Sequence, residues 1–243
     1  MESATIRRLA DLNRAFYDQH AENFADSRPR LAPGAARLLA DLRPGARVLE
    51  LGCGDGKAAR RLARDAPPAF YLGLDGSLAM LLRARRYCLA AGALPPQTGF
   101  ALADLSAGAL PLSPAAFDCA LAFAVLHHLP GFDTRARLMA GVAARLAPGG
   151  RALLSNWQFT RSARLLERVV PWAAAGLTEA DVEPGDYLVA WERKGRQGVR
   201  YIHLLDAAEA RQLAERAGLA VLDVFSSDGR SNRLAEYVVM SRV

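Results

Sequence analysis

Three glycines at alternate positions, directly after a short apolar strand, constrain this chain more than any other feature. They are Gly52, Gly54 and Gly56 in the run from Val48, and a helix-like run from Lys57 to Arg64 follows them. A glycine at every second position lets the backbone pass close to a ligand where a side chain would collide. The helix behind it offers free amide groups and the positive end of its dipole. The sequence therefore predicts a nucleotide-binding turn between a strand and a helix.

The spacing of the glycines narrows the class of nucleotide. The pattern is GxGxG, whereas a dinucleotide site has GxGxxG and a phosphate loop has GxxxxGK[ST]. This spacing argues against NAD and ATP as ligands. Glycine also occurs in such turns for purely steric reasons, so the triplet needs support from its neighbourhood.

Polar residues at the ends of predicted strands give that support. Apolar runs at residues 70–74, 100–103 and 117–124 predict further buried strands, and strands and helices alternate as in a parallel sheet covered on both faces. Ligands of such sheets lie outside the carboxyl ends of the strands, where an aspartate can accept both hydroxyls of a ribose. The polar residues at or just past these ends are Glu50, Asp75, Asp104 and His127.

Taken together, these motifs resemble a known family. ELGCGDG, LGLDGS, ADL, FDCALAFAVLHHL and LAPGG are similar to the successive motifs of the class I S-adenosylmethionine (SAM) dependent methyltransferases. The resemblance implies SAM as the cofactor. It also implies an α/β fold with a Rossmann-like, seven-stranded, mostly parallel sheet, helices on both faces and the last strand antiparallel. Because the resemblance covers nearly the whole chain, we expect a single domain over residues 1–243.

The same resemblance assigns roles to the residues of each motif. It implies that Glu50 binds the amino group of SAM and the loop amides, and that Asp75 takes the ribose hydroxyls. Asp104, with the amide of Leu105, is expected to read the adenine edge, and the backbone around Phe123 to face the methionine amino group. The cofactor-binding residues expected on this basis are Tyr17, Glu50, Gly52, Gly54, Asp75, Gly76, Asp104, Leu105 and Phe123.

The amino-terminal residues predict an amphipathic helix. Apolar side chains recur at steps of three and four over residues 5–25, with Asp, Asn and Arg assigned to the other face. Residues 16–28, FYDQHAENFADSR, resemble the segment that closes over SAM in many of these enzymes, with Tyr17 near the methionine part and Arg28 near the active site. Residues 1–30 are therefore expected to form a lid, and the alternative is a helix that simply packs on the sheet.

After Trp157 the alternation of strands and helices breaks. We expect a helix over residues 161–175, then a hairpin of strands 186–191 and 199–205 with Gly195 and Gly198 in its turn. A capping box at Asp206 predicts a helix that ends at Gly218, and two strands close the chain. Residues 158–205 are the expected substrate-recognition insertion.

The insertion suggests the chemistry of the methyl acceptor. Together with the amino-terminal segment it is similar to the tRNA wobble-uridine carboxymethyl methyltransferases, which esterify a carboxylate. Such a substrate is ionised at pH 7 and needs a cation rather than a base, ideally the bidentate fork of an arginine. The candidates are Arg28, Arg200 and Arg230. The chain shows no evident long basic tail or zinc module for tRNA, although the resemblance leaves room for a small partner subunit.

Two rival functions remain open. A small-molecule O- or N-methyltransferase of the same fold would use His127 or His128 as a base for an unionised nucleophile. Adjacent histidines point to opposite sides of an extended segment, so we expect one of them, His127, to face the site. The other rival, a non-catalytic SAM-binding regulatory subunit, fits the intact motif set less well. No metal site is expected.

The composition of the chain limits its possible partners, the role of its cysteines and its expected localisation. The net charge of this 243-residue chain is +6, all of it within residues 1–159, which permits a polyanionic partner such as RNA. The basic residues are almost all arginine, so a solvated surface explains most of them. The three cysteines are too scattered for a disulfide framework and are expected to be buried. No apolar run reaches the roughly 18 residues of a membrane span, and we expect a cytoplasmic protein.

Overall fold

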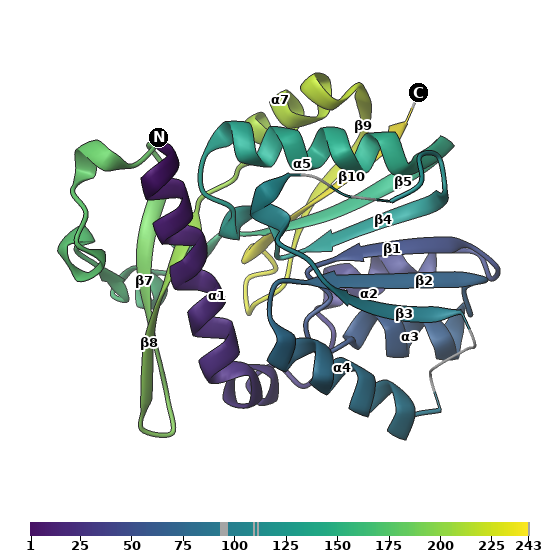
Figure 1. Ribbon diagram of the computed structural model, residues 1–243, viewed down its shortest axis with the longest axis horizontal. Helices are drawn as coiled ribbons and strands as arrows, with labels where there is room; N and C mark the ends of the chain where they lie inside the picture. Colours follow the sequence, from purple (N-terminus) through teal and green to yellow (C-terminus); the bar gives the residue numbers. More distant parts are fainter. Residues whose placement is uncertain (93–96, 109, 111, 243) are drawn as a thin grey trace.

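The computed structural model describes residues 1–92, 97–108, 110 and 112–242 (Figure 1). Pro95 and Pro96, where the sequence predicts a loop, lie outside these residues. The body of the molecule is a seven-stranded sheet in the order β3-β2-β1-β4-β5-β10-β9. Its strands are β1 (Arg47–Leu51), β2 (Phe70–Asp75), β3 (Thr98–Leu102), β4 (Phe117–Phe123), β5 (Leu146–Trp157), β9 (Leu219–Ser227) and β10 (Ala235–Arg242).

The directions of the strands confirm the predicted fold class. Strands β3, β2, β1, β4 and β5 pair in parallel, and β10 runs antiparallel to both β5 and β9. Chain order reverses at β1, whose neighbours are β2 and β4. In sheets of this kind the loops after the two strands at the reversal diverge and leave a crevice for a ligand.

Helices cover both faces of the sheet, as Figure 1 shows. On one face α5 and α7 bury a core that includes Leu49, Leu51 and Leu138. On the other face, α2 and α3 pack against a core that includes Val48 and Leu121. The residues Val48–Leu51 of β1 are therefore buried on both faces of the sheet, as expected for a central parallel strand. The helices are α2 (Pro33–Ala40), α3 (Lys57–Asp65), α4 (Leu78–Ala90), α5 (Phe132–Arg145) and α7 (Ala207–Ala217).

Local signals fix the ends of several helices where they were predicted. Asp206 accepts the Glu209 N–H at 2.9 Å at the start of α7, and Gly218 ends that helix in the left-handed conformation. Gly56 precedes α3 with φ at +76°. Strand β5 starts at Leu146, and its pairing with β4 shifts register before residue 151. None of the helices in the described part of the chain is long and apolar enough to cross a membrane.

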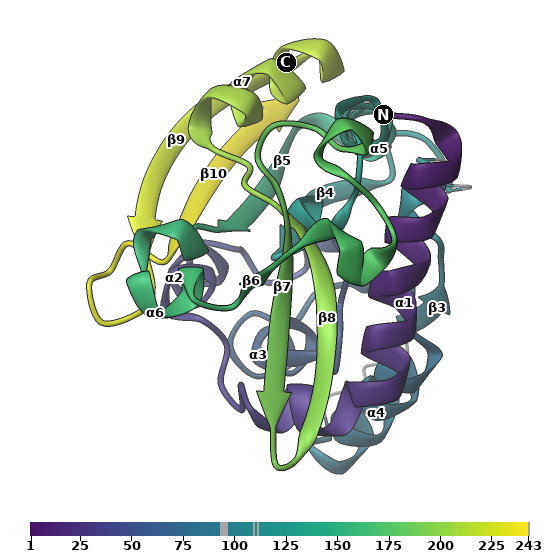
Figure 2. The same ribbon diagram turned by 90° about the vertical axis from the view of Figure 1, so that its left-hand side faces the viewer.

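A second, smaller sheet stands apart from the first. Strands β6 (Val169–Val170), β7 (Asp186–Arg193) and β8 (Arg196–His203) form it in that order, with antiparallel pairing. Helix α1 (Ser3–Asp26) packs against β8 of the hairpin and against α4, and both Figure 1 and Figure 2 show it beside the β7–β8 hairpin. The amino-terminal helix and the insertion therefore form one wall opposite the carboxyl ends of the strands.

Two expectations for the insertion are wrong. The helix predicted over residues 161–175 is broken into α6 (Ala163–Leu166), strand β6 and short 3-10 turns, because β6 pairs with β7 and Pro171 has no N–H to continue a helix. Gly198 is not part of the hairpin turn, which lies at Lys194 and Gly195, both with positive φ. Gly198 belongs to β8, where a Cβ would lie 2.8 Å from the ring of Phe16, so this glycine lets α1 approach the strand.

Candidate active site

A cavity of about 1070 Å³ opens at the carboxyl ends of the main-sheet strands, between them and the wall made by α1 and the insertion. Its volume is slightly above the usual range for ligand sites, about 300–1,000 Å³, which leaves room for a cofactor and a second molecule. Arg230 lies exposed in the turn between β9 and β10 and is not among the described lining residues. The predicted site residues that line the cavity are Tyr17, Arg28, Glu50, Gly52, Gly54, Asp75, Gly76, Asp104, Leu105, Phe123, His127 and Arg200.

The glycine turn presents bare backbone to this cavity. Gly52 and Gly54 have φ values of +62° and +53°, which side chains rarely adopt. A Cβ on Gly52 would collide with Val125 at 2.5 Å, whereas a Cβ on Gly54 would enter open space. Asp75 holds the turn in place, since its carboxylate accepts the Gly54 N–H at 2.8 Å and the Ser77 N–H at 2.9 Å. Burial raises the pKa of Asp75 above its usual value, and these amide bonds oppose that shift.

Glu50 is the buried carboxylate at the floor of the cavity. Its side chain accepts a hydrogen bond from the hydroxyl of Tyr71, and it has no ion pair with a basic group of the described residues. Burial raises its pKa to about 8, and the nearby carboxylate of Asp75 adds to the effect. A ligand with an ammonium group would supply the missing positive charge, so the site fits the amino group of SAM.

The loops after β3 and β4 complete this end of the cavity. One oxygen of Asp104 accepts hydrogen bonds from the amide and hydroxyl of Ser106, which fixes the short 3-10 turn that begins at Leu105. Ala124, directly after Phe123, has a φ of +59°, and its N–H donates to the Ser155 hydroxyl at 3.0 Å. A positive φ on alanine is strained, and such strain tends to occur at ligand sites.

The two histidines do not lie on an extended segment. They belong to a 3-10 turn, Leu126–His128, so the expectation that only one of them faces the site is wrong: both line the cavity, with ring centroids 4.4 Å apart. His127 Nδ1 accepts the Trp157 N–H at 3.2 Å, which places the ring proton on Nε2. Burial lowers the pKa of His127 well below its usual value, and the charges of His128 and Arg200 lower it further.

The His128 ring is held by two neighbours. Its Nε2 lies 2.8 Å from the hydroxyl of Tyr17 and its Nδ1 lies 3.3 Å from the carbonyl oxygen of Tyr201. The carbonyl accepts only, so the ring proton belongs on Nδ1 and the Tyr17 hydroxyl donates to Nε2. Burial, followed by the charge of Arg200, lowers the pKa of His128 to about 3. Both imidazoles are therefore neutral at pH 7.

Arg200 projects from β8 into the same end of the cavity. Its side chain is only 4% exposed, and its guanidinium lies over the rings of Phe16, Phe24 and Trp157 at 5.1, 5.2 and 5.6 Å. It forms no ion pair with the carboxylates of residues that the structure describes, and its buried Nε has no hydrogen-bond partner. Most buried arginines in proteins are paired, so a charge left free beside a cavity indicates a binding group.

Asn13 is a site residue that the sequence analysis missed. Asparagine was expected on the polar face of the helix, but Asn13 is buried and lines the cavity. Its side chain binds the backbone of Tyr201 and donates to the His128 carbonyl at 3.1 Å. Its position one turn from Leu9 and from Phe16 was the available signal, because it places a polar residue within the apolar stripe.

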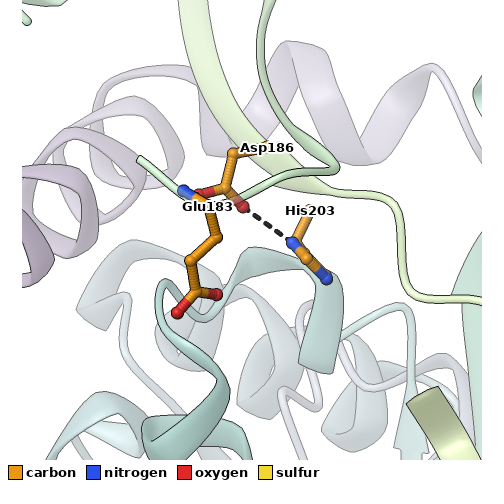
Figure 3. A group of neighbouring side chains, drawn as sticks. All are labelled: Glu183, Asp186 and His203. Atoms are coloured by element: carbon orange, nitrogen blue, oxygen red, sulfur yellow. Dashed lines mark hydrogen bonds and ion pairs between the residues drawn. The ribbon is translucent and has the colours of Figure 1, made fainter. Parts of the chain in front are cut away.

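A second cluster of ligand-type side chains lies in the insertion, away from the cavity (Figure 3). It contains Glu183, Asp186 and His203, and the His203 Nδ1 lies 2.7 Å from Asp186. The other ring nitrogen lies 2.6 Å from Glu209, which also binds the buried Arg135. Burial opposes protonation, but the bonds to the two carboxylates hold the pKa of His203 above its usual value. Both ring nitrogens of His203 already face carboxylate oxygens of the protein, so the cluster is a hydrogen-bonded network of the chain's own groups.

Three relatives connect this geometry to known proteins. The chain is 26% identical to a tRNA (carboxymethyluridine(34)-5-O)-methyltransferase of Schizosaccharomyces pombe, over 85% of this chain and 88% of that one. It is 36% identical to a trans-aconitate 2-methyltransferase of Methylobacterium radiotolerans, over 69% of this chain and 59% of that one. It is 26% identical to a mouse protein described as a probable tRNA methyltransferase 9B, over 65% of this chain. The match spans only 33% of the mouse protein's length.

Solved structures share the fold. A SAM-dependent methyltransferase of Methanosarcina mazei superimposes with a TM-score of 0.66 at 19% identity, over 88% of this chain and 99% of that one. A methyltransferase of Haloferax volcanii, solved in complex with the Trm112 methyltransferase activator, gives a TM-score of 0.65 at 18% identity, over 94% and 96% of the two chains.

The family itself follows from the sequence match. The model of the methyltransferase domain family matches residues 22–224, from the second half of α1 to β9, well over half of the chain. The matched part includes the glycine turn, Asp75, Asp104, the histidine turn and the whole insertion. This chain belongs to the methyltransferase domain family, and it is an enzyme.

Proposed function

We propose that this methyltransferase transfers the methyl group of SAM to a carboxylate oxygen, and that Arg200 binds the acceptor carboxylate. The observation that carries the proposal is the buried, unpaired guanidinium of Arg200 at the cavity wall. A carboxylate there would form paired hydrogen bonds with the guanidinium and satisfy the free Nε. The aromatic rings around Arg200 exclude water and so strengthen that interaction.

The state of the histidines supports an acceptor that is already ionised. A hydroxyl or ammonium acceptor needs a base with a pKa near the working pH. His127 carries its proton on the nitrogen that is free to face a ligand, and His128 gives its lone pair to Tyr17. Neither ring therefore has a free basic nitrogen. A carboxylate needs no base, and the His127 Nε2–H can donate a hydrogen bond to it.

The other end of the cavity suits SAM. We infer that Glu50 pairs with the SAM ammonium and that Asp75 accepts the ribose hydroxyls. Gly52, Gly54 and Gly76 leave space for the cofactor, while Asp104 and Leu105 contact the adenine and Phe123 and Tyr17 flank the methionine part. SAM supplies a sulfonium methyl group for in-line displacement. The protein has mainly to align the carboxylate with that methyl group and to keep water out.

Two of the relatives support this acceptor chemistry. The names of the yeast enzyme and of the Methylobacterium enzyme both specify an acceptor that carries carboxylate groups, one on tRNA and one on a small molecule. We therefore place a carboxymethyl group on tRNA wobble uridine first and a small polycarboxylic acid second. A small-molecule hydroxyl or amine remains the alternative from a different chemistry.

The test uses the stability of the product. Methyl esters release methanol in mild alkali, whereas methyl ethers and methylamines do not. Purified protein would be given SAM with a labelled methyl group and either tRNA with a free carboxymethyl uridine or small carboxylic acids. We expect label that becomes volatile after alkali, and loss of turnover in Arg200→Lys, which keeps the charge but not the fork. Alkali-stable label would overturn the proposal.

We also propose that a small partner subunit binds α4. The Haloferax neighbour was solved with its Trm112 activator, and α4 beside the edge strand β3 carries exposed leucines at positions that share one helix face. They are Leu78, Leu82 and Leu89, exposed by 54, 62 and 59%. Co-expression with a Trm112-type subunit should give a 1:1 complex, and Leu82→Glu should abolish it. A Leu82→Glu chain that still binds would move the interface elsewhere.

A further inference from the structure

Arg200 is one of several arginines at the acceptor end of the cavity. Arg28, Arg168 and Arg193 line it as well, and they come from three separate segments: the end of α1, the residue before β6 and the end of β7. The chain folds so that these segments meet, since Arg193 lies 3.5 Å from the carbonyl oxygen of Asp26 and Arg168 pairs through its backbone with Ala190.

These arginines lack the partners that other arginines of the molecule have. In the described chain, Arg83, Arg135 and Arg161 each form an ion pair with a carboxylate. By contrast, no ion pair joins Arg28, Arg168, Arg193 or Arg200 to any of the carboxylates that the structure describes. The carboxylate of Glu192 also lines this end, but it is exposed and outnumbered.

The positive charges of Arg200, Arg193 and Arg168 all act on the guanidinium of Arg28. Arg28 keeps contact with solvent, yet the protein around it and the charge of Arg200 lower its pKa to about 10, and Arg193 and Arg168 add to the effect. Arg28 therefore remains charged at neutral pH. A single carboxylate can occupy one bidentate fork, and the buried Arg200 is the best placed to receive it. Arg28, Arg168 and Arg193 would then still lack an anionic partner among the described residues.

We propose that Arg28, Arg168 and Arg193 form a second anion subsite, so the methyl acceptor carries another anionic group besides the carboxylate bound by Arg200. This inference rests on the proposed function for the identity of the accepting group. Both possible sources of this anion are ionised oxygen acids. One is a phosphate of the RNA strand next to the modified base, and the other is a second carboxylate of a small polyacid.

The second subsite would also explain how one carboxylate is selected. Esterification removes the negative charge of the accepting group, so Arg200 loses its attraction for the product. The second anionic group keeps its charge and holds the substrate in one orientation before transfer. Binding energy at the unreactive end thus positions the reactive end, as expected when alignment dominates catalysis.

The experiment compares acceptors of different charge. Full-length protein and the variants Arg168→Gln, Arg193→Gln and the double variant would be assayed, with Arg211→Gln on the exposed face of α7 as the matched control. The acceptors would be a carboxymethyl-uridine anticodon stem-loop, the carboxymethyl-uridine nucleoside, trans-aconitate and a monocarboxylic acid of similar size. Calorimetry with SAM and thermal unfolding would check that the cofactor site and the fold are unchanged.

Each single variant should raise the KM of a multiply charged acceptor roughly 10–100-fold, the usual loss for hydrogen bonds to an ionised group, with kcat little changed. The monoanionic acceptors should be poor substrates whose KM does not respond. A response with the stem-loop identifies the anion as phosphate, and a response with trans-aconitate identifies it as carboxylate.

The proposal is overturned if the variants leave the KM unchanged for both acceptors, or if the wild type uses monoanionic acceptors equally well. Alkali-labile ester would still form in that case, whereas failure of the proposed function gives no ester from any acceptor.

Discussion

The side-chain amide of Asn13 binds both backbone groups of Tyr201: its Oδ1 accepts the Tyr201 N–H at 2.9 Å and its Nδ2 donates to the Tyr201 carbonyl at 3.0 Å. Strand β8 is the outer strand of the small sheet, so these groups have no further strand to pair with. Asn13 therefore takes the place of a neighbouring strand and joins α1 to the residue that follows Arg200.

Asn13→Ala should destabilise the chain by about 1–3 kcal/mol, because it leaves the buried Tyr201 N–H without a partner and the Tyr201 carbonyl with only its contact to His128 Nδ1. Turnover should fall as well, since Arg200 and His128 lose part of their support. Urea unfolding would measure the first effect and acceptor kinetics the second. Gln19→Ala, on the exposed side of the same helix, is the control and should change little. Equal stability of the Asn13 variant would mean that water replaces the amide.

The sequence predicted the parts of the fold whose signals are local. The glycine turn, the aspartates after β2 and β3, the Asp206 cap and the Gly218 end each depend on a few adjacent residues, and each element lies where it was expected. The helix over residues 161–175 failed because Val169 and Val170 pair with residues about twenty positions away, a contact that helical periodicity does not reveal.

The candidate site also has a part with local sequence signals and a part without them. Its cofactor end was reached from motifs with fixed spacing, and the acceptor end only through the resemblance to a subgroup. Arg168 and Arg193 could not be singled out, because arginine is common along the whole chain and pairing in three dimensions decides which ones remain free. Arg230 and Arg200 were equal candidates from the sequence, yet Arg230 is not among the described residues that line the cavity.

SAM binding should release a proton at Glu50. In the free chain its pKa is about 8, so the carboxyl is protonated at pH 7, whereas an adjacent ammonium favours the ionised form. Affinity should therefore rise as the pH increases towards 8 and level off above it. Calorimetry in buffers of different ionisation enthalpy would count the proton. Glu50→Gln should bind more weakly and lose the pH dependence; a wild-type affinity that does not change between pH 6 and 8 would contradict the assignment.

The His203 network should stabilise the fold most at mildly acidic pH. Because its folded pKa is raised, the contribution is complete below the unfolded value of about 6.5 and is lost as the pH rises through the folded value. His203→Gln should flatten the alkaline decline of the unfolding free energy. His20→Gln is a useful control. Burial lowers the pKa of His20, so its contribution to the unfolding free energy changes with pH in the opposite direction. An unchanged alkaline slope in His203→Gln would place the titrating group elsewhere.

Helix α1 should become more protected when SAM binds. Its Asp18 accepts the Ser77 hydroxyl at 2.6 Å, and Ser77 also donates its N–H to Asp75, the proposed ribose ligand. Hydrogen exchange over residues 13–26 should therefore slow on addition of SAM, while α7, on the far side of the sheet, should not respond. Slow exchange in α1 that is indifferent to SAM would count against the lid and favour a helix packed permanently on the cavity.

The last prediction separates a hydrogen-bond donor from a base at His127. Its Nδ1 accepts the Trp157 N–H, so Nε2 carries the proton and can only donate. Glutamine can reproduce both bonds, with its oxygen towards the backbone amide and its nitrogen towards the acceptor, but it cannot take up a proton. His127→Gln should therefore keep activity within about tenfold, whereas loss of a general base would cost about 10²–10⁴-fold.

The pH profile provides an independent readout of the same question. With an ionised carboxylate acceptor and no base, kcat at saturating SAM should show no acidic limb near pH 6–7 in either the wild type or His127→Gln. His127→Ala serves as the matched variant that removes both hydrogen bonds, and it should be slower than the glutamine variant. If the glutamine and alanine variants were equally inactive, and the wild-type profile titrated with a single group near 6.5, His127 would be acting as a base and the acceptor would be an unionised hydroxyl or amine.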